Sequence, residues 1–195
     1  MTHVLYFAHA VNCYGTPYEK AALELIAKTF PDAIVENPNQ LKHQDGYTAY
    51  QERTAKSRDD HKGMSYFYDE VLPDCTGCVA MPFLDGRFGL GVAGEAQQCL
   101  ETGKPVWLMT PANPSKQHVR DWVRNPDNGL FIISLVTNAE RAELLATNKE
   151  GSALVVGHQE TRLRTWLVYG VKQRPYEEAH LASMPIPDDF YPEKK

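Results

Sequence analysis

The stretch CVAMPFLDGRFGLGVAGEAQQCLETGKPVWLM (residues 78–109) decides the fold class of this chain. It contains an apolar run, Cys78–Met81, then a glycine-rich loop and a helical pattern from about 92 to 102. Gly103 ends the helical pattern and a proline follows shortly after it, which is a common way for an α-helix to stop before a strand. Pro105–Met109 is a second apolar run. The stretch therefore predicts one β-α-β unit of a parallel sheet.

The same alternation extends in both directions from this unit. On the N-terminal side, Val4–Ala8 predicts a strand, and Thr16-Pro17-Tyr18-Glu19 combines a capping box with a proline at the first helical position. On the C-terminal side, Thr137-Asn138-Ala139-Glu140 is a second capping box, which opens a helix to about Thr147. Further strands are expected at Ala33–Val35, Leu130–Leu135 and Ala153–Val156, and further helices at 63–72 and 160–169. We therefore expect one α/β domain over residues 1–173 and an extended tail over 174–195.

The polar segment from Asn37 to about His61 interrupts this pattern. A long polar stretch inside a compact domain is often a functional lid or a binding segment. The alternative is a solvated loop with a short helix near Tyr47–Lys56. Both interpretations remain open at this point.

Composition and charge exclude several classes of function. The 195 residues carry a net charge of −5, with 43% hydrophobic and 23% charged residues, as is ordinary for a globular chain. An acidic balance argues against a nucleic-acid partner, because binding phosphates needs a basic face. No apolar run approaches the roughly 18 residues that span a bilayer, and no secretory signal pattern is present at the N-terminus. We therefore expect no membrane partner and a cytoplasmic location.

The four cysteines are Cys13, Cys75, Cys78 and Cys99. Cytosolic thiols stay reduced, so disulfides are not expected. Cys75 and Cys78 have the spacing of a redox or metal motif, but a zinc site needs a second ligand pair, and none follows at the usual spacing. We interpret Cys78 as the start of a buried strand and expect no bound metal.

The loops after the parallel strands should hold the functional site, because open parallel sheets bind ligands at the carboxyl ends of their strands. Gly89, Gly91 and Gly94 surround a helix start there, and Glu95 follows. Glycines let backbone amides approach a ligand, and the helix dipole should keep Glu95 ionised. Such a carboxylate can be a nucleophile or can stabilise positive charge. The structural alternative is that Glu95 is an ordinary acid in the first turn of the helix, beside packing glycines.

The run Asp85–Ala96, together with Gly103-Lys104-Pro105-Val106, resembles the nucleoside 2-deoxyribosyltransferase superfamily. That family has a glycine-containing loop, a catalytic glutamate at the next helix start and a similar entry to the following strand. Tyr6-Phe7-Ala8 matches the end of its first strand, and Asp69 falls where its second acid is expected. The resemblance covers roughly residues 4–109.

The resemblance implies a flavodoxin-like open parallel sheet with helices on both faces, and cleavage or transfer of an N-glycosidic bond without a cofactor. Glu95 would attack C1′ of the sugar and form a covalent glycosyl-enzyme, as in retaining glycosidases. Asp69 would assist the leaving base or bind a sugar hydroxyl, and Tyr6 would orient Glu95 through its hydroxyl group. Family members are commonly oligomeric, so a homo-oligomer is expected.

One position departs from the family pattern. Six residues before the glutamate, members that use nucleosides tend to carry Asp, and members that hydrolyse monophosphates tend to carry Ser. This chain has Gly89 there. Arg87 would suit a 5′-phosphate and Asp85 a free 5′-hydroxyl group, so the choice between nucleoside and nucleotide stays open.

His9, Asn12 and Tyr14 lie in the loop after the first strand and are candidates to contact the base, although loop Asn and Tyr are also common turn residues. Three other functions compete. A non-catalytic nucleotide-binding or sensing module on the same fold is the main alternative. A cytokinin-activating phosphoribohydrolase ranks lower, because its threonine and double glycine are missing. A flavin protein ranks lower too, because residues 8–14 lack Ser and Thr.

Overall fold

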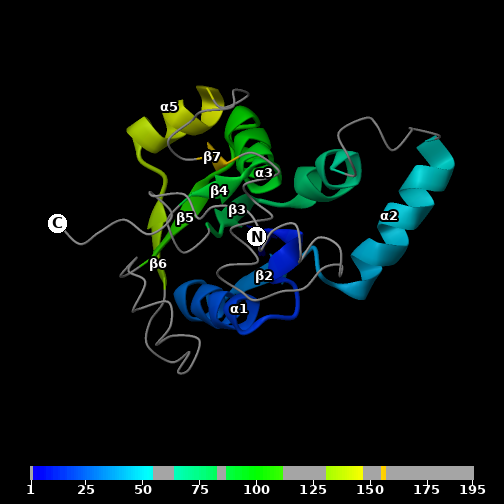
Figure 1. The fold of residues 1–195 in the computed structure, drawn as a ribbon, viewed down its shortest axis with the longest axis horizontal. Helices are drawn as coiled ribbons and strands as arrows, with labels where there is room; N and C mark the ends of the chain where they lie inside the picture. Colours follow the sequence, from blue (N-terminus) through cyan, green and yellow to red (C-terminus); the bar gives the residue numbers. More distant parts are fainter. Residues whose placement is uncertain (1, 55–63, 83–86, 112–130, 147–154, 157–195) are drawn as a thin grey trace, which may run out of the picture.

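The computed structural model describes residues 2–54, 64–82, 87–111, 131–146 and 155–156. Its main sheet has five strands in the order β2-β1-β3-β5-β6, and a two-stranded parallel ladder joins β4 to β7 (Figure 1). The strands are β1 (His3–Ala8), β2 (Ala33–Glu36), β3 (Gly77–Ala80), β4 (Phe88–Gly89), β5 (Val106–Pro111), β6 (Phe131–Leu135) and β7 (Val155–Val156). In the main sheet β2, β1, β3 and β5 are parallel, and β6 is antiparallel to β5.

Helices lie on both faces of the sheet. In Figure 1, α1 lies on one side of the strands, and α3 and α5 lie on the other. The helices are α1 (Pro17–Thr29), α2 (Leu41–Thr54), α3 (Leu90–Glu101) and α5 (Asn138–Ala146), with short 3-10 turns η1 (Val11–Cys13) and η4 (Leu72–Asp74) and a π-helical turn η3 (Phe67–Val71).

Strand β1 shows why the core has two halves. Successive side chains of a strand point to opposite faces. Tyr6 and Ala8 therefore pack with α3 and α5, whereas Leu5 and Phe7 pack with α1. All four are buried, as expected for a central strand covered on both sides.

The expected α/β class is confirmed, with one correction. The expectation of a fully parallel sheet is wrong for the last strand, because β6 runs antiparallel to β5. Leu135 of β6 pairs with Trp107 of β5. The apolar run of β6 predicts a strand but carries no information about its direction, which depends on the path of the chain from β5. The predicted 160–169 helix and the 174–195 tail lie outside the described residues, and the division at residue 173 stays a prediction.

The ends of two helices follow their local sequence signals. Gly103 has φ +75°, and the amides of Gly103 and Lys104 donate to the carbonyls of Leu100 and Cys99, which is a Schellman motif. At α5, Thr137 and Glu140 exchange both hydrogen bonds of the predicted capping box. The Lys104 Nζ atom also donates to the carbonyl oxygens of Leu72 and Pro73, at 2.6 and 2.8 Å.

Helix α2 occupies most of the polar segment and begins six residues before the short helix predicted there. It extends away from the sheet in Figure 1 and is attached through the segment around η3. His43 and Tyr50 of α2 are its buried side chains, and both have ring contacts with Tyr66. None of the described helices combines the length and the hydropathy that crossing a membrane requires.

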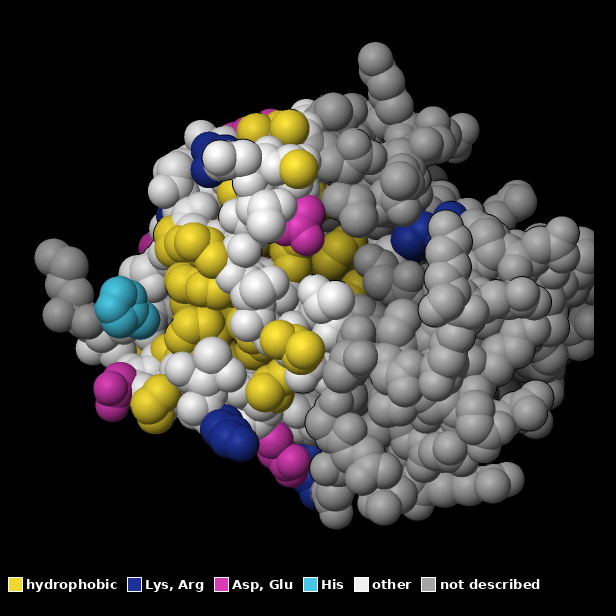
Figure 2. Space-filling view, turned by 90° about the vertical axis from the view of Figure 1, so that its left-hand side faces the viewer, with side chains coloured by type: hydrophobic (Ala, Val, Ile, Leu, Met, Phe, Trp, Pro, Cys, Tyr) yellow, Lys and Arg dark blue, Asp and Glu magenta, His cyan; other side chains and the backbone are white. Residues whose placement is uncertain are grey.

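Strand β6 lies at the edge of the described sheet. Figure 2 shows the molecule from the side on which β6 lies in Figure 1, and apolar side chains gather on that surface. Ile132 and Leu135 of β6 are both more than half exposed. The expected homo-oligomer stays a prediction.

Candidate functional site

The centre of the site is a hydrogen bond between β1 and α3. The Tyr6 hydroxyl group donates to Glu95 Oε1 at 2.6 Å, and both side chains are buried. Tyr6 lies on β1 beside Cys78 of β3, at the point where the strand order reverses. Open α/β sheets bind ligands at the carboxyl ends of the strands at such a point. The contact expected between Tyr6 and Glu95 is therefore present, and it lies next to the region where a ligand is expected.

The charge state of Glu95 differs from the sequence-based expectation. Helix α3 begins at Leu90, two residues earlier than predicted, so Glu95 lies in the second turn, where the helix dipole acts weakly. Burial raises the pKa of Glu95 to about 8, although the hydrogen bond from Tyr6 lowers it. Glu95 is therefore mostly protonated at pH 7, and the expectation that it stays ionised is wrong.

Four other side chains lie in the electrostatic environment of Glu95. Burial and then the Glu95 charge raise the pKa values of Tyr14 and Tyr68, the latter to about 12. A hydrogen bond with Cys99 raises the pKa of Cys78 and lowers that of Cys99. Glu95 and Cys99 are one turn apart on α3, above the adjacent strand residues Tyr6 and Cys78. The two thiols of the Cys75–Cys78 motif have different partners, because Cys75 donates to the Val71 carbonyl oxygen.

Tyr68 is a site residue that sequence reasoning missed. Its hydroxyl group lies so close to Gly94 that a Cβ atom there would collide with it. Tyr68 belongs to the π-helical turn η3, and such turns are frequent at functional sites. A π-turn rotates the side chains relative to an α-helix, so sequence spacing alone does not tell which of them faces α3.

Asp69, the next residue, contacts a different element. It accepts a hydrogen bond from the Tyr50 hydroxyl group of α2, and its side chain is exposed. Nearby, Arg53 of α2 pairs with Glu70 at 2.7 Å. The groups that set the pKa of Glu95 besides burial are Tyr6 and Cys99. The catalytic role of Asp69 stays a prediction.

The loop after β1 brings together two of its three candidate residues. The His9 ring is buried and stacks on the Phe7 ring, with 4.1 Å between the ring centroids. The centroid of the Tyr14 ring lies 4.8 Å from that of His9. His9 Nδ1 lies 2.9 Å from the Phe7 carbonyl oxygen and Nε2 lies 3.3 Å from Glu19 Oε1. Asn12 lies on η1, and its side chain is outside the described part of the chain. Base contact by these residues stays a prediction.

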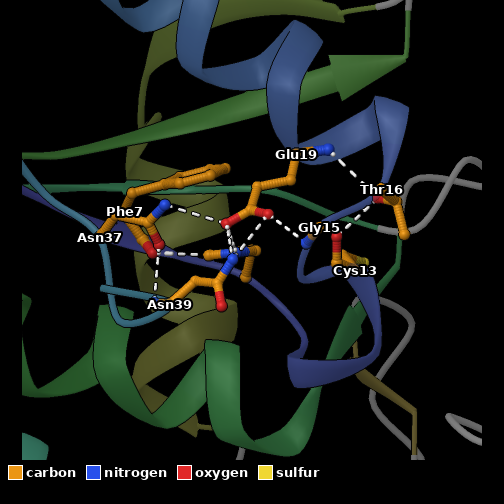
Figure 3. Close-up of polar contacts among 8 residues, drawn as sticks. Phe7, Cys13, Gly15, Thr16, Glu19, Asn37 and Asn39 are labelled. Carbon is orange, nitrogen blue, oxygen red and sulfur yellow. Dashed lines mark hydrogen bonds and ion pairs between the residues drawn. The ribbon is translucent and has the colours of Figure 1, made fainter. Parts of the chain in front are cut away.

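Glu19 is the second residue that sequence reasoning missed. The capping box at the start of α1 forms only half of its pair: Thr16 Oγ1 accepts from the Glu19 amide at 3.4 Å, but the Glu19 carboxylate turns inward. There it meets the amide of Gly15 and the side chains of Asn37 and Asn39 (Figure 3). Its Oε1 atom also lies 3.3 Å from His9 Nε2. The glutamate of a capping box normally binds the backbone, so the motif alone did not predict this cluster.

The glycine-rich loop is described in part. Asp85 lies outside the described residues, and Arg87 is half-buried just before β4. Gly89 is the N-cap residue of α3, and Gly91 lies in its first turn. A Cβ atom at Gly91 would meet Met64 Sδ at 3.6 Å, an ordinary contact. The close approach that requires a glycine is therefore at Gly94.

Among the described residues, no group of three or more His, Cys, Asp or Glu side chains is arranged to hold a metal ion. Comparisons of this chain with models of protein families, with curated proteins and with solved structures found no match.

Proposed function

We propose that this protein cleaves or transfers the N-glycosidic bond of a nucleoside or a nucleoside 5′-monophosphate through a glycosyl-Glu95 intermediate. The observation that carries the proposal is the buried Tyr6–Glu95 hydrogen bond between β1 and α3, beside the point where the strand order reverses. Oε1 is oriented by Tyr6, and Oε2 has no hydrogen-bond partner among the described residues. A carboxylate held by one oxygen has its other oxygen available for attack.

The reaction balances in two steps. In the first, Oε2 of ionised Glu95 attacks C1′, the C1′–N bond breaks, and its electron pair leaves with the base, which takes up a proton. In the second, the oxygen atom of water or a ring nitrogen of another base attacks C1′, and the C1′–Oε2 bond breaks with its electron pair returning to the Glu95 carboxylate. The proton of the attacking group passes to solvent. The transition states resemble an oxocarbenium ion, which an adjacent anion stabilises.

The raised pKa of Glu95 makes the proposed reaction depend on pH. With a pKa of about 8, only a minor fraction of the protein carries ionised Glu95 at pH 7. Positive charge that develops on the sugar favours the ionised form. Base release at subsaturating substrate should therefore rise with pH up to about 8.

The assignment of the sheet to the flavodoxin-like fold is also part of the proposal. In chain order, the main-sheet strands follow the 2-1-3-4-5 arrangement of flavodoxin-like sheets, and the fifth departs from it in direction. In that arrangement the start of α3 faces the ligand region. The amide groups of its first turn, which no side chain of the N-cap residue Gly89 caps, and the half-buried Arg87 suit a 5′-phosphate.

Asp69 would assist the leaving base from the η3 side. Tyr50 donates to its carboxylate, as Tyr6 donates to that of Glu95, so each acid is oriented by a tyrosine from another element. If this orientation matters, Tyr50→Phe lowers base release by about 10-fold and Asp69→Asn lowers it further.

The test is a panel of purine and pyrimidine nucleosides and their 5′-monophosphates, with ribose and 2-deoxyribose, followed by chromatography of released base. Wild-type protein should release a base from at least one of them, and Glu95→Gln should lower the rate by at least about 10³-fold. Glu101→Gln is the matched control, because Glu101 is exposed on the same helix. Mass spectrometry of the quenched reaction should show a sugar adduct on the Glu95 peptide. No base release from any member, or full activity in Glu95→Gln, refutes the proposal.

A non-catalytic nucleotide-binding or sensing module is the second candidate. The observation that favours it is the burial of the hydrogen-bonded Tyr6–Glu95 pair, because such a pair is also a stable structural contact. This function predicts calorimetric binding of a nucleotide that Glu95→Gln leaves unchanged, with no turnover of the bound ligand.

A further inference from the structure

The segment that contains η3 packs on the side of α3 that carries Glu95, and it lies between α3 and α2 in Figure 1. Gly91 and Glu95 are four residues apart and therefore lie on the same face of α3. A Cβ atom at Gly91 would meet Met64 Sδ at 3.6 Å. A Cβ atom at Gly94, the residue before Glu95, would collide with the Tyr68 hydroxyl group. The segment therefore contacts α3 one turn before Glu95 and directly beside it.

The same segment contacts the hydrogen-bond partner of Glu95. The centroid of the Phe67 ring lies 6.2 Å from that of the Tyr6 ring. Phe67 and Tyr68 both pack against the buried cluster that contains Tyr6, and Tyr6 donates to Glu95 Oε1 at 2.6 Å. Two consecutive residues of η3 therefore contact Tyr6 and the helix position that precedes Glu95. These contacts place the Tyr68 hydroxyl group beside the central acid.

The Tyr68 hydroxyl group is available to a ligand. Within the described part of the chain nothing hydrogen-bonds it, and the residue is half-buried. Burial and then the charge of Glu95 raise the pKa of Tyr68 to about 12, so the hydroxyl group keeps its proton at pH 7 and can donate it in a hydrogen bond. Packing does not need this oxygen atom, because a phenylalanine beside an alanine would fill the same space without a glycine in the helix interior.

The chemistry of the proposed reaction indicates which group of a substrate this hydroxyl would bind. Glu95 would attack C1′, whose neighbours in the sugar ring are O4′ and C2′. A donor to O4′ would oppose the positive charge that spreads onto this oxygen in an oxocarbenium-like transition state. The 2′-hydroxyl group of ribose is the other polar group next to C1′, and hydrogen bonds to it strengthen in the transition states of glycosidases. A 2-deoxyribosyl substrate lacks this group.

We propose that Tyr68 is a substrate-binding residue whose hydroxyl group donates to the 2′-hydroxyl group of a ribosyl substrate at Glu95. The inference rests on the proposed function for the class of substrate and adds the identity of the sugar. Tyr68 acts through this hydrogen bond alone, and no bond to it forms or breaks in the reaction. The contact favours ribose over 2-deoxyribose.

The first experiment measures kcat/KM for base release from the ribosyl and 2-deoxyribosyl forms of each nucleoside and 5′-monophosphate. Tyr68→Phe removes only the hydroxyl group. It should lower kcat/KM by at least about 10-fold for a ribosyl substrate and by less than about 3-fold for the 2-deoxyribosyl form. Equal losses would show a structural role and overturn the proposal. Base release from 2-deoxyribosyl substrates alone overturns it too and leaves the proposed function standing.

Tyr66→Phe is the matched control. Tyr66 lies two residues earlier in the same segment, and its hydroxyl group lies 3.2 Å from His43 Nδ1 of α2. The ratio of the ribosyl to the 2-deoxyribosyl kcat/KM should stay unchanged in this variant. A change as large as in Tyr68→Phe overturns the proposal.

The state of Glu95 is checked by NMR in protein with carbon-13 in its glutamate carboxyl groups, with Glu95→Gln to assign the signal. The Glu95 midpoint should stay near 8 in Tyr68→Phe. A shift of about one pH unit or more would attribute the loss to Glu95 itself and overturn the proposal. If Tyr68→Phe does not fold, Gly94→Ala displaces the hydroxyl group and should lower the same ratio. A folded Gly94→Ala with an unchanged ratio then overturns it.

Calorimetry on Glu95→Gln separates this proposal from the proposed function, because it needs no turnover. The probes are the 5′-monophosphates of adenosine, guanosine, cytidine and uridine, each with ribose and with 2-deoxyribose. At least one ribosyl probe should bind, and adding Tyr68→Phe should weaken its binding by about 3- to 10-fold and leave that of the 2-deoxyribosyl form unchanged.

The two proposals fail in different ways. If wild-type protein releases no base but the calorimetry shows the ribose-specific loss, the proposed function fails and the assignment of Tyr68 stands. If wild-type protein releases base and Tyr68→Phe has no ribose-specific effect, the assignment fails and the proposed function stands. Neither binding nor base release with any ribosyl probe refutes both.

Discussion

The hydroxyl group of Tyr68 occupies the space that a side chain at Gly94 would need, one residue before Glu95 on α3. The contact joins the π-helical turn to the helix that carries the central acid, and it explains why a helix interior has a glycine here. Gly94 is therefore required by the close approach of Tyr68, whereas Gly91, three residues earlier on α3, has room for a side chain. Substitution of each glycine by alanine tests this difference.

Gly94→Ala should displace Tyr68 and destabilise the protein by about 1 to 3 kcal/mol, the usual cost of overpacking. Gly91→Ala is the control: its methyl group meets only Met64, at 3.6 Å or more, and alanine favours the helix by up to about 1 kcal/mol. Urea denaturation measures both. Combining Gly94→Ala with Tyr68→Phe removes the colliding atom and should restore most of the loss. Equal effects of the two alanines would refute the collision.

The buried Glu95 should make the protein less stable as pH rises. Its pKa is raised from 4.5 to about 8 on folding, so its contribution is complete below pH 4.5 and is lost as pH rises through 8. Between pH 4.5 and about 8, the free energy of unfolding of wild-type protein should fall by up to about 5 kcal/mol relative to that of Glu95→Gln, at about 1.4 kcal/mol per pH unit. Denaturation at several pH values between 4 and 9 measures the difference. A flat difference would show that Glu95 is not desolvated, and Glu101→Gln provides the exposed control.

Tyr6→Phe should raise the pKa of Glu95 further, because the hydrogen bond from Tyr6 lowers it. The alkaline rise of base release should then move to higher pH by about one unit. The carboxyl NMR titration gives the same answer without turnover. Tyr68→Phe is the comparison, since the Tyr68 hydroxyl group has no hydrogen bond to Glu95 and should leave the midpoint nearly unchanged. A fall of the midpoint in Tyr6→Phe would contradict the role given to Tyr6.

Lys104→Met should destabilise the fold without changing the site. The ammonium group donates to the carbonyl oxygens of Leu72 and Pro73, and their loss should cost about 1 to 2 kcal/mol. The Glu95 titration and the KM of any substrate found should stay the same. The exposed Lys20→Met on α1 should change stability by less than about 0.5 kcal/mol. A change in KM with unaltered stability would show that Lys104 contributes to substrate binding and not to the stability of the fold.

Much of the fold follows from local patterns. The apolar runs of β1 and β3, the Schellman end at Gly103 and the capping box at Thr137 were all predictable, because each depends on residues within one or two turns of each other. The direction of β6 was not, because an apolar run pairs equally well in either direction. The resemblance to glycosyl-transferring enzymes also implied the Tyr6–Glu95 contact, but not Tyr68, which a π-turn presents to α3.

The two buried glutamates show what the sequence determined and what the tertiary structure decided. The sequence placed Glu19 and Glu95 near the starts of helices, where the same local signal suggests an ionised acid in both cases. In the fold, Glu19 has donors from the loop before α1 and from the segment after β2 and stays charged, whereas Glu95 has one hydroxyl donor and is mostly neutral at pH 7. The number of donors around a buried carboxylate sets its charge, and here most of those donors come from segments distant in the chain.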